Sequence, residues 1–103
     1  MVNFNYNPEN KTFTATFVGR MDTLAVEKMN EVMSVNIPLS EGKSKDKIIF
    51  DLRDVEYISS SFIRICVSIA KQAGQGQFSI VHCQPFVKKT FKISGLDDIL
   101  NVT

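Results

Sequence analysis

The chain has 103 residues, of which 44% are hydrophobic, and its 12 Lys and Arg residues against 11 Asp and Glu residues give a formal net charge of +1. This length and apolar content predict one globular domain over residues 1–103 and exclude a disordered chain. A charge so close to zero provides no field that would attract nucleic acid or an anionic membrane surface, so neither is expected as a partner.

Three further features concern the compartment of the protein. The two cysteines, Cys66 and Cys83, lie in apolar segments and form no CxxC pair, which favours small buried thiols over a disulfide. The N-terminus carries no basic region followed by an apolar stretch, as a secretory signal would. No apolar run approaches the ~20 residues that span a bilayer. We therefore expect a soluble, reduced protein of the cytoplasm.

Two segments with alternating apolar residues open the chain. Residues 2–6 and 12–17 each alternate apolar with polar side chains, which predicts two half-buried strands. Residues 7–11 between them are rich in turn formers, so the two strands should form an antiparallel hairpin. Gly19 is expected to end the second strand.

An amphipathic helix is predicted over residues 23–35. Apolar residues recur there at spacings of three and four, namely Val26, Met29, Val32 and Met33. Asp22 or Thr23 can cap its start, and Asp22 has two open roles, a helix cap or a contact with a partner. Residues 36–47 then predict an irregular surface loop because they combine proline, glycine, serine and many charges.

The central stretch combines a buried strand with a capped helix. Residues 48–52 form a short apolar run typical of a strand buried on both faces, and residues 53–57 are expected to be a polar connection. Residues 59–61 are three serines at the N-cap of an apolar helix over residues 62–73, and Gly74 lies at its C-cap.

This helix should expose its serines and one polar stripe. At ~100° per residue, the stripe consists of Arg64, Ser68, Lys71 and Gln72. Phe62 lies on the opposite apolar arc and is expected to pack toward the core, while residues 59–61 are expected to be exposed. The start of a helix also favours a phosphate group, because its backbone N–H groups point outward.

The C-terminal part predicts another strand and helix. Residues 78–81 form an apolar strand expected to lie parallel to residues 48–52. His82 is the only histidine and has no carboxylate or cysteine near it in a ligand pattern, so no metal site is expected. A helix should run from Pro85 to a stop at Gly95. The apolar Leu96, Ile99 and Leu100 should then form a short last helix of about one turn.

The order of elements gives the fold class. Strand, strand, helix, strand, helix, strand, helix and short helix predict an α/β domain with a mixed β-sheet, in which an N-terminal hairpin joins parallel βαβ units. Helices are expected mainly on one face of the sheet.

The central stretch resembles the signature of STAS domains, a family that includes the bacterial anti-sigma factor antagonists. The resemblance is carried by Asp51-Leu52, by Val55 three residues on, and by the serine run that opens an apolar helix. It implies that Ser60 is the phosphoacceptor, with Ser61 as the alternative. This chain departs from the usual pattern in having Ser59 in place of Asp and Phe62 in place of Gly.

The resemblance extends over most of the chain. Residues 19–22 and 91–96 also look like parts of a STAS domain. It implies a regulatory module without a cofactor, whose partner is an anti-sigma factor or a serine kinase of the GHKL ATPase type. Phosphorylation of the serine would release this partner. The expected contact residues are Asp22, Ser59, Ser60, Ser61 and Arg64.

Other functions stay open at this point. The chain could be a non-signalling STAS subunit of a lipid-transport ATPase complex, or a domain that binds a small ligand or nucleotide, and Ser60 could be a plain helix cap. An enzyme is not expected, because there is no glycine-rich phosphate loop and no Cys–His pair with an orienting group. Asp51 and Asp54 could bind Mg²⁺ only with the help of an acidic cluster that the first strand lacks.

Overall fold

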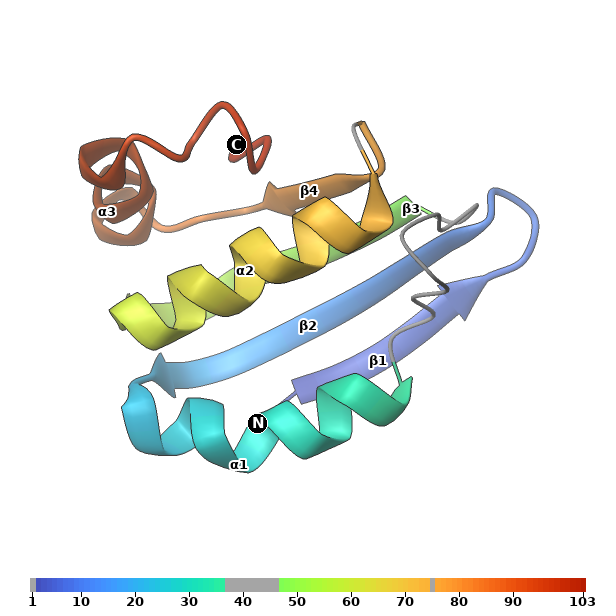
Figure 1. Cartoon of the computed structure of the whole chain (residues 1–103), viewed down its shortest axis with the longest axis horizontal. Coiled ribbons are helices and arrows are strands. Elements are labelled where there is room, and N and C mark those ends of the chain that lie inside the picture. Colours follow the sequence, from blue (N-terminus) through green and yellow to red (C-terminus); the bar gives the residue numbers. More distant parts are fainter. Residues whose placement is uncertain (1, 37–46, 75) are drawn as a thin grey trace.

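The computed structural model describes residues 2–36, 47–74 and 76–103, and Figure 1 shows them as a sheet with helices packed against it. In chain order, the elements are β1 (Val2–Asn7), β2 (Thr12–Met21), α1 (Thr23–Asn36), β3 (Lys47–Ile58), α2 (Ser60–Ala73), β4 (Phe78–Val81) and α3 (Pro85–Ser94). Within these residues, no helix is long and apolar enough to cross a membrane.

The strands form a mixed sheet in the order β1-β2-β3-β4. β1 pairs antiparallel with β2, as expected for the N-terminal hairpin. β2 pairs parallel with β3, and β3 pairs parallel with β4, so α1 and α2 are the helices of two βαβ crossovers. The predicted α/β class, the hairpin and the parallel units are therefore confirmed.

One face of the sheet carries the core. Along β3 the buried residues are Ile48, Phe50, Leu52, Val55 and Ile58. Arg53 and Asp54 are both exposed, which interrupts the strict alternation, and the pairing of β2 with β3 shifts register at this level. Val55 and Ile58 are again separated by two residues, and a second register shift lies between them. The two irregularities together keep all five apolar side chains on one face. α1 and α2 lie over that face in Figure 1, as predicted.

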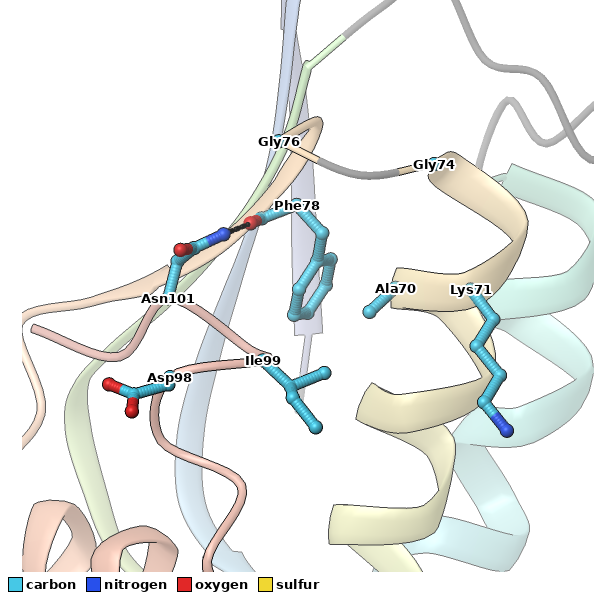
Figure 2. A pocket seen from close by; sticks show the side chains of 8 residues that line it. All are labelled: Ala70, Lys71, Gly74, Gly76, Phe78, Asp98, Ile99 and Asn101. Atoms are coloured by element: carbon cyan, nitrogen blue, oxygen red, sulfur yellow. Dashed lines mark hydrogen bonds between the residues drawn. The ribbon is translucent and has the colours of Figure 1, made fainter.

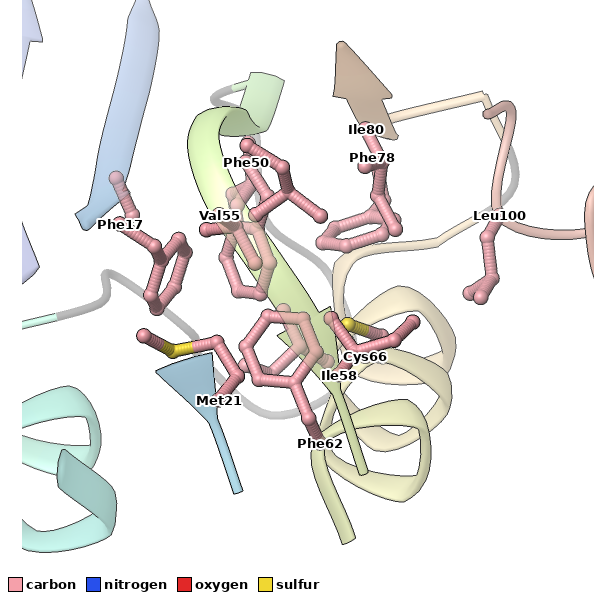
Figure 3. Packing of buried hydrophobic residues seen from close by; sticks show 14 of the residues in the cluster. Phe17, Met21, Phe50, Val55, Ile58, Phe62, Cys66, Phe78, Ile80 and Leu100 are labelled. Atoms are coloured by element: carbon pink, nitrogen blue, oxygen red, sulfur yellow. The ribbon is translucent and has the colours of Figure 1, made fainter. Parts of the chain in front are cut away.

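Aromatic rings join α2 to the sheet. The ring centroids of Phe17 and Phe50 are 4.8 Å apart, and those of Phe50 and Phe78 are 4.9 Å apart. Phe62 from α2 meets Phe17 edge to face at 5.3 Å. All four side chains are buried, and Figure 3 shows Phe62 directed toward the strands. The prediction that Phe62 packs into the core is confirmed.

Residues 53–57 do not form the expected polar connection, because β3 continues through them to Ile58. They pair with the end of β2, where Val55 lies opposite Gly19 and Ile58 lies opposite Met21. β2 likewise does not end at Gly19, whose φ of 102° and local register shift instead mark an irregularity within the strand.

The C-terminal residues 96–100 form turns instead of the expected short helix. Gly95 ends α3 in a left-handed conformation, as predicted, and the chain then returns to the sheet. There Ile80 donates to the carbonyl of Asn101, and Thr103 donates to the carbonyl of Ile80. Leu100 is buried, so this tail closes one side of the core.

The remaining helix predictions are confirmed within the described residues. α1 begins at Thr23, and Val26 and Met29 are buried on it. The predicted loop at residues 36–47 is shorter at both ends, because Asn36 ends α1 and Lys47 begins β3. Residues 37–46 and the side chains of Val32 and Met33 lie outside the part of the chain that the structure describes.

Candidate functional site

The first turns of α1 and α2 lie together at one edge of the sheet. β2 and β3 are parallel, so their ends, Met21 and Ile58, reach the same edge. The backbone N–H of Ser59 donates to the carbonyl of Met21 at 2.9 Å, which fixes the start of α2 beside the start of α1. α1 and α2 are in contact, and Figure 1 shows both helices beginning at this edge.

Ser59 is the N-cap of α2 and is only 7% exposed, so the expectation that all three serines are exposed is wrong for Ser59. Its backbone is extended, and its Oγ accepts a hydrogen bond from the Phe62 N–H at 3.3 Å. The bond to Met21 and the inward packing of Phe62 hold Ser59 against the core. The capping role therefore belongs to Ser59 and not to Ser60.

Ser60 is the first residue of α2 and is exposed, whereas Ser61 is half-buried. Within the described residues, the Ser60 hydroxyl has no hydrogen-bond partner. Ser60 is thus the serine of the run whose hydroxyl is accessible and not engaged in holding the helix.

Asp22 caps α1. Its Oδ1 accepts a hydrogen bond from the Ala25 N–H at 2.9 Å, and the residue is half-buried. This confirms one of the two roles considered for Asp22. Its contact with a partner stays a prediction.

Arg64 lies one helical turn after Ser60. It is exposed together with Ser68, Lys71 and Gln72, as the helical projection predicted. No ion pair engages Arg64 among the described residues. An unpaired guanidinium therefore stands beside the accessible serine.

Leu24 is an exposed apolar residue that the sequence predictions did not single out. It lies in the first turn of α1, and 61% of its surface is exposed. At ~100° per residue, it projects about 160° away from the buried Val26, so the helical projection contained this signal. Leu24 places an apolar side chain at the edge that also carries Ser60.

His82 does have a carboxylate neighbour, contrary to expectation. Its Nδ1 lies 3.2 Å from Asp51 Oδ2, because Asp51 lies opposite Val81 in the parallel pairing of β3 with β4. Among the described residues, no group of three His, Cys, Asp or Glu side chains is arranged to hold a metal ion.

The cysteines differ in burial. Cys66 is fully buried as expected, whereas Cys83 is only partly buried. Burial raises the pKa of the Cys66 thiol well above its usual value. Burial also raises the pKa of Cys83 to about 11, with Lys88 lowering and Asp51 raising it to smaller extents. Both thiols are therefore poor nucleophiles at neutral pH.

A hollow of about 490 Å³ lies at the other end of α2. Figure 2 shows it between the last turn of α2 and the C-terminal tail, where the Asn101 amide donates to the carbonyl of Phe78 at 2.8 Å. Lys71 and Asp98 are its charged lining residues. Since α2 rises ~1.5 Å per residue, the hollow is about 20 Å from Ser60 and is separate from the serine edge.

The cap assignment predicts a specific loss of stability. Ser59→Ala removes the acceptor for the Phe62 N–H and should lower the free energy of unfolding by about 1 kcal/mol, or the melting temperature by about 4–8 °C. Thermal melting followed by circular dichroism measures this. Ser60→Ala is the matched control and should melt within about 2 °C of wild type, while Ser59→Asp should keep the cap. Equal melting of Ser59→Ala and Ser60→Ala would refute the assignment.

Comparison with known proteins points to one family. A family model described as the STAS domain matches residues 15–103. A protein of Bordetella bronchiseptica, BtrV, which is named as an anti-sigma factor antagonist, is 32% identical over 74 residues, covering 70% of this chain and 64% of that protein. The chain thus spans slightly less than two thirds of the length of this relative.

Solved structures share the fold. A crystal structure of an anti-sigma factor antagonist from Mycobacterium paratuberculosis superposes with a TM-score of 0.76 at 16% identity, covering 99% of this chain and 85% of that one. The anti-sigma factor antagonist SpoIIAA in its unphosphorylated form gives a TM-score of 0.63 at 16% identity, covering 90% of this chain and 83% of that one. At these identities the likeness concerns the fold.

Proposed function

The chain belongs to the STAS domain family, and on this basis we propose that it is a regulatory protein-binding module of the anti-sigma factor antagonist type. In this proposal it binds an anti-sigma factor that is also a serine kinase of the GHKL ATPase type. Phosphorylation of Ser60 by this partner ends the binding. The observation that carries the proposal is the exposed, uncommitted hydroxyl of Ser60 at the first residue of α2.

The lower accessibility of the two neighbouring serines supports Ser60 as the phosphoacceptor. Ser59 Oγ is occupied by the Phe62 N–H, and Ser59 is 7% exposed, so a kinase would have to unfold the cap to reach it. Ser61 is half-buried, which leaves it the less accessible alternative.

The surface around Ser60 has the mixed character of a protein interface. Leu24 supplies an exposed apolar side chain and Arg64 an exposed cation. Arginine is enriched among the residues that dominate protein–protein contacts, and an exposed apolar side chain adds area that a partner can bury. Asp22 caps α1, Ser61 lies in the first turn of α2, and both are half-buried.

The proposal is tested by mass spectrometry of the protein purified from its own cells. An intact mass increased by one phosphate, with the phosphate mapped to Ser60, is the expected result. Phosphate found only on Ser61 would overturn the assignment of Ser60. Binding to a partner without any phosphorylation would instead favour a non-signalling accessory subunit of a transport ATPase complex.

A second test concerns Leu24. We expect Leu24→Ala to weaken the partner complex by about 2 kcal/mol, or roughly 30-fold in Kd, because the apolar area that the partner would bury on this side chain is lost. The melting temperature should hardly change, since Leu24 is 61% exposed. Ile99→Ala is the matched control, because Ile99 is 63% exposed but lines the hollow at the far end of α2. Isothermal titration with the partner gives Kd, and equal Kd values for the two variants would exclude Leu24 from the interface.

A further inference from the structure

Ser60 and Arg64 are four residues apart on α2, and both are exposed. Residues at this spacing lie on the same face of a helix, one turn apart. Helical side chains lean toward the N-terminus, so a side chain as long as that of Arg64 can reach back over the turn that carries Ser60. An acidic group four residues before a basic one is also the more favourable order for a pair on a helix.

The charges nearby leave Arg64 available. The first turn of α2 contains no acidic residue. Among the described residues, no carboxylate is paired with the Arg64 guanidinium. A phosphate on Ser60 could therefore pair with the Arg64 guanidinium without displacing a carboxylate from it.

The backbone at the start of α2 adds donors to the same place. Ser59 already donates its N–H to Met21, and the Phe62 N–H is taken by the Ser59 side chain. The N–H groups of Ser60 and Ser61 are then the ones that the helix itself leaves without partners. They point out of the helix start, where the phosphate would be attached.

We propose that the Arg64 guanidinium binds the phosphate of phosphorylated Ser60 within the same chain and is thereby withdrawn from the partner. This inference rests on the proposed function, because it assumes that Ser60 is the residue modified. Arg64 is a positioning residue in this scheme: it faces the partner before modification and holds the phosphate afterwards. Modification then removes a cation from the interface in addition to introducing an anion.

Arginine suits this role better than lysine would. Its planar guanidinium can offer two parallel N–H donors to two phosphate oxygens, whereas an ammonium acts as a point charge. Arg64→Lys should therefore retain only part of the interaction with the Ser60 phosphate, and Arg64→Gln should lose this interaction. Because Arg64 is exposed, neither change should disturb the fold.

The experiment uses protein with phosphoserine incorporated genetically at position 60, so that no kinase is needed. Phosphorus-31 NMR follows the second ionisation of the phosphate, whose usual pKa is about 6. A nearby cation favours the dianion and lowers this pKa. We expect the pKa in the otherwise wild-type chain to be about 0.2–0.4 of a pH unit below that in Arg64→Gln, with Arg64→Lys between them.

Lys71→Gln is the matched control, since Lys71 is an exposed cation in the last turn of α2. It should titrate like wild type. The difference between wild type and Arg64→Gln should shrink as salt is raised, as expected for an exposed ion pair. Identical titrations of wild type and Arg64→Gln would overturn the proposal.

The outcome is separable from that of the proposed function. The titration involves neither kinase nor partner, so a lack of phosphorylation in cells would refute the proposed function without altering the measured pKa. Conversely, identical titrations would refute the role of Arg64 while leaving a switch at Ser60 in place.

Discussion

Phe62→Ala should lower the free energy of unfolding by about 3–5 kcal/mol, which is a large share of the 5–15 kcal/mol typical of a small domain. Phe62 is 0% exposed and packs against the rings of Phe17, at 5.3 Å, and Phe50, at 6.3 Å. Its removal leaves a cavity between α2 and the sheet and abolishes these ring contacts. Urea denaturation followed by circular dichroism measures the loss.

The matched control is Phe86→Ala, because Phe86 has the same side chain but is 60% exposed on α3. This change should stay within about 0.5 kcal/mol of wild type. Phe62→Leu should fall between the two, since it refills part of the cavity. If Phe62→Ala costs less than about 1 kcal/mol, Phe62 is not the anchor between α2 and the sheet.

The helices were predictable from local signals. The apolar arc of α2 is continuous over residues 62–73, and its ends are marked by serine and Gly74. α3 is likewise bounded by Pro85 and Gly95. Such caps and a 3.6-residue periodicity depend on residues close in sequence, so they can be recognised without knowing what the helix packs against.

The strand ends were not predictable in this way. Residues 53–57 are mostly polar, yet they continue β3 because they pair with the end of β2, which lies more than thirty residues earlier. Gly19 predicts a strand end from its residue type alone, whereas in the structure it accommodates a register shift within the pairing. These features depend on which strand becomes the neighbour and on where a bulge interrupts the alternation.

The serine edge was predicted in outline but not in its division of roles. Three consecutive serines have the same capping propensity, and the sequence did not distinguish them. The bond from the Ser59 N–H to Met21 fixes which serine faces inward, and this contact joins distant parts of the chain. Leu24 was not predicted as a contact residue, although it projects away from the buried stripe of its helix.

The last prediction is that an acidic group at Ser60 weakens binding of the partner without destabilising the fold. A phosphate adds about −1.5 to −2 charges at neutral pH and would lie at the start of α2, where a negative charge is favoured by about 0.3–1 kcal/mol. Since Ser60 is exposed and the cap belongs to Ser59, an acidic group at Ser60 breaks no hydrogen bond of the fold. Its effect must then fall on the interface, through repulsion, bulk and the cost of removing water from a charged group.

Ser60→Asp should therefore melt within about 2 °C of wild type and still bind the kinase-like partner about a hundredfold more weakly, which corresponds to ~2.8 kcal/mol. Ser60→Ala should bind like wild type and should no longer respond to the kinase, because it has no hydroxyl to modify. Thermal melting and isothermal titration with the partner provide the two measurements. Melting of Ser60→Asp far below wild type would make Ser60 a structural residue. Wild-type affinity of Ser60→Asp would exclude a charge-operated switch at this position.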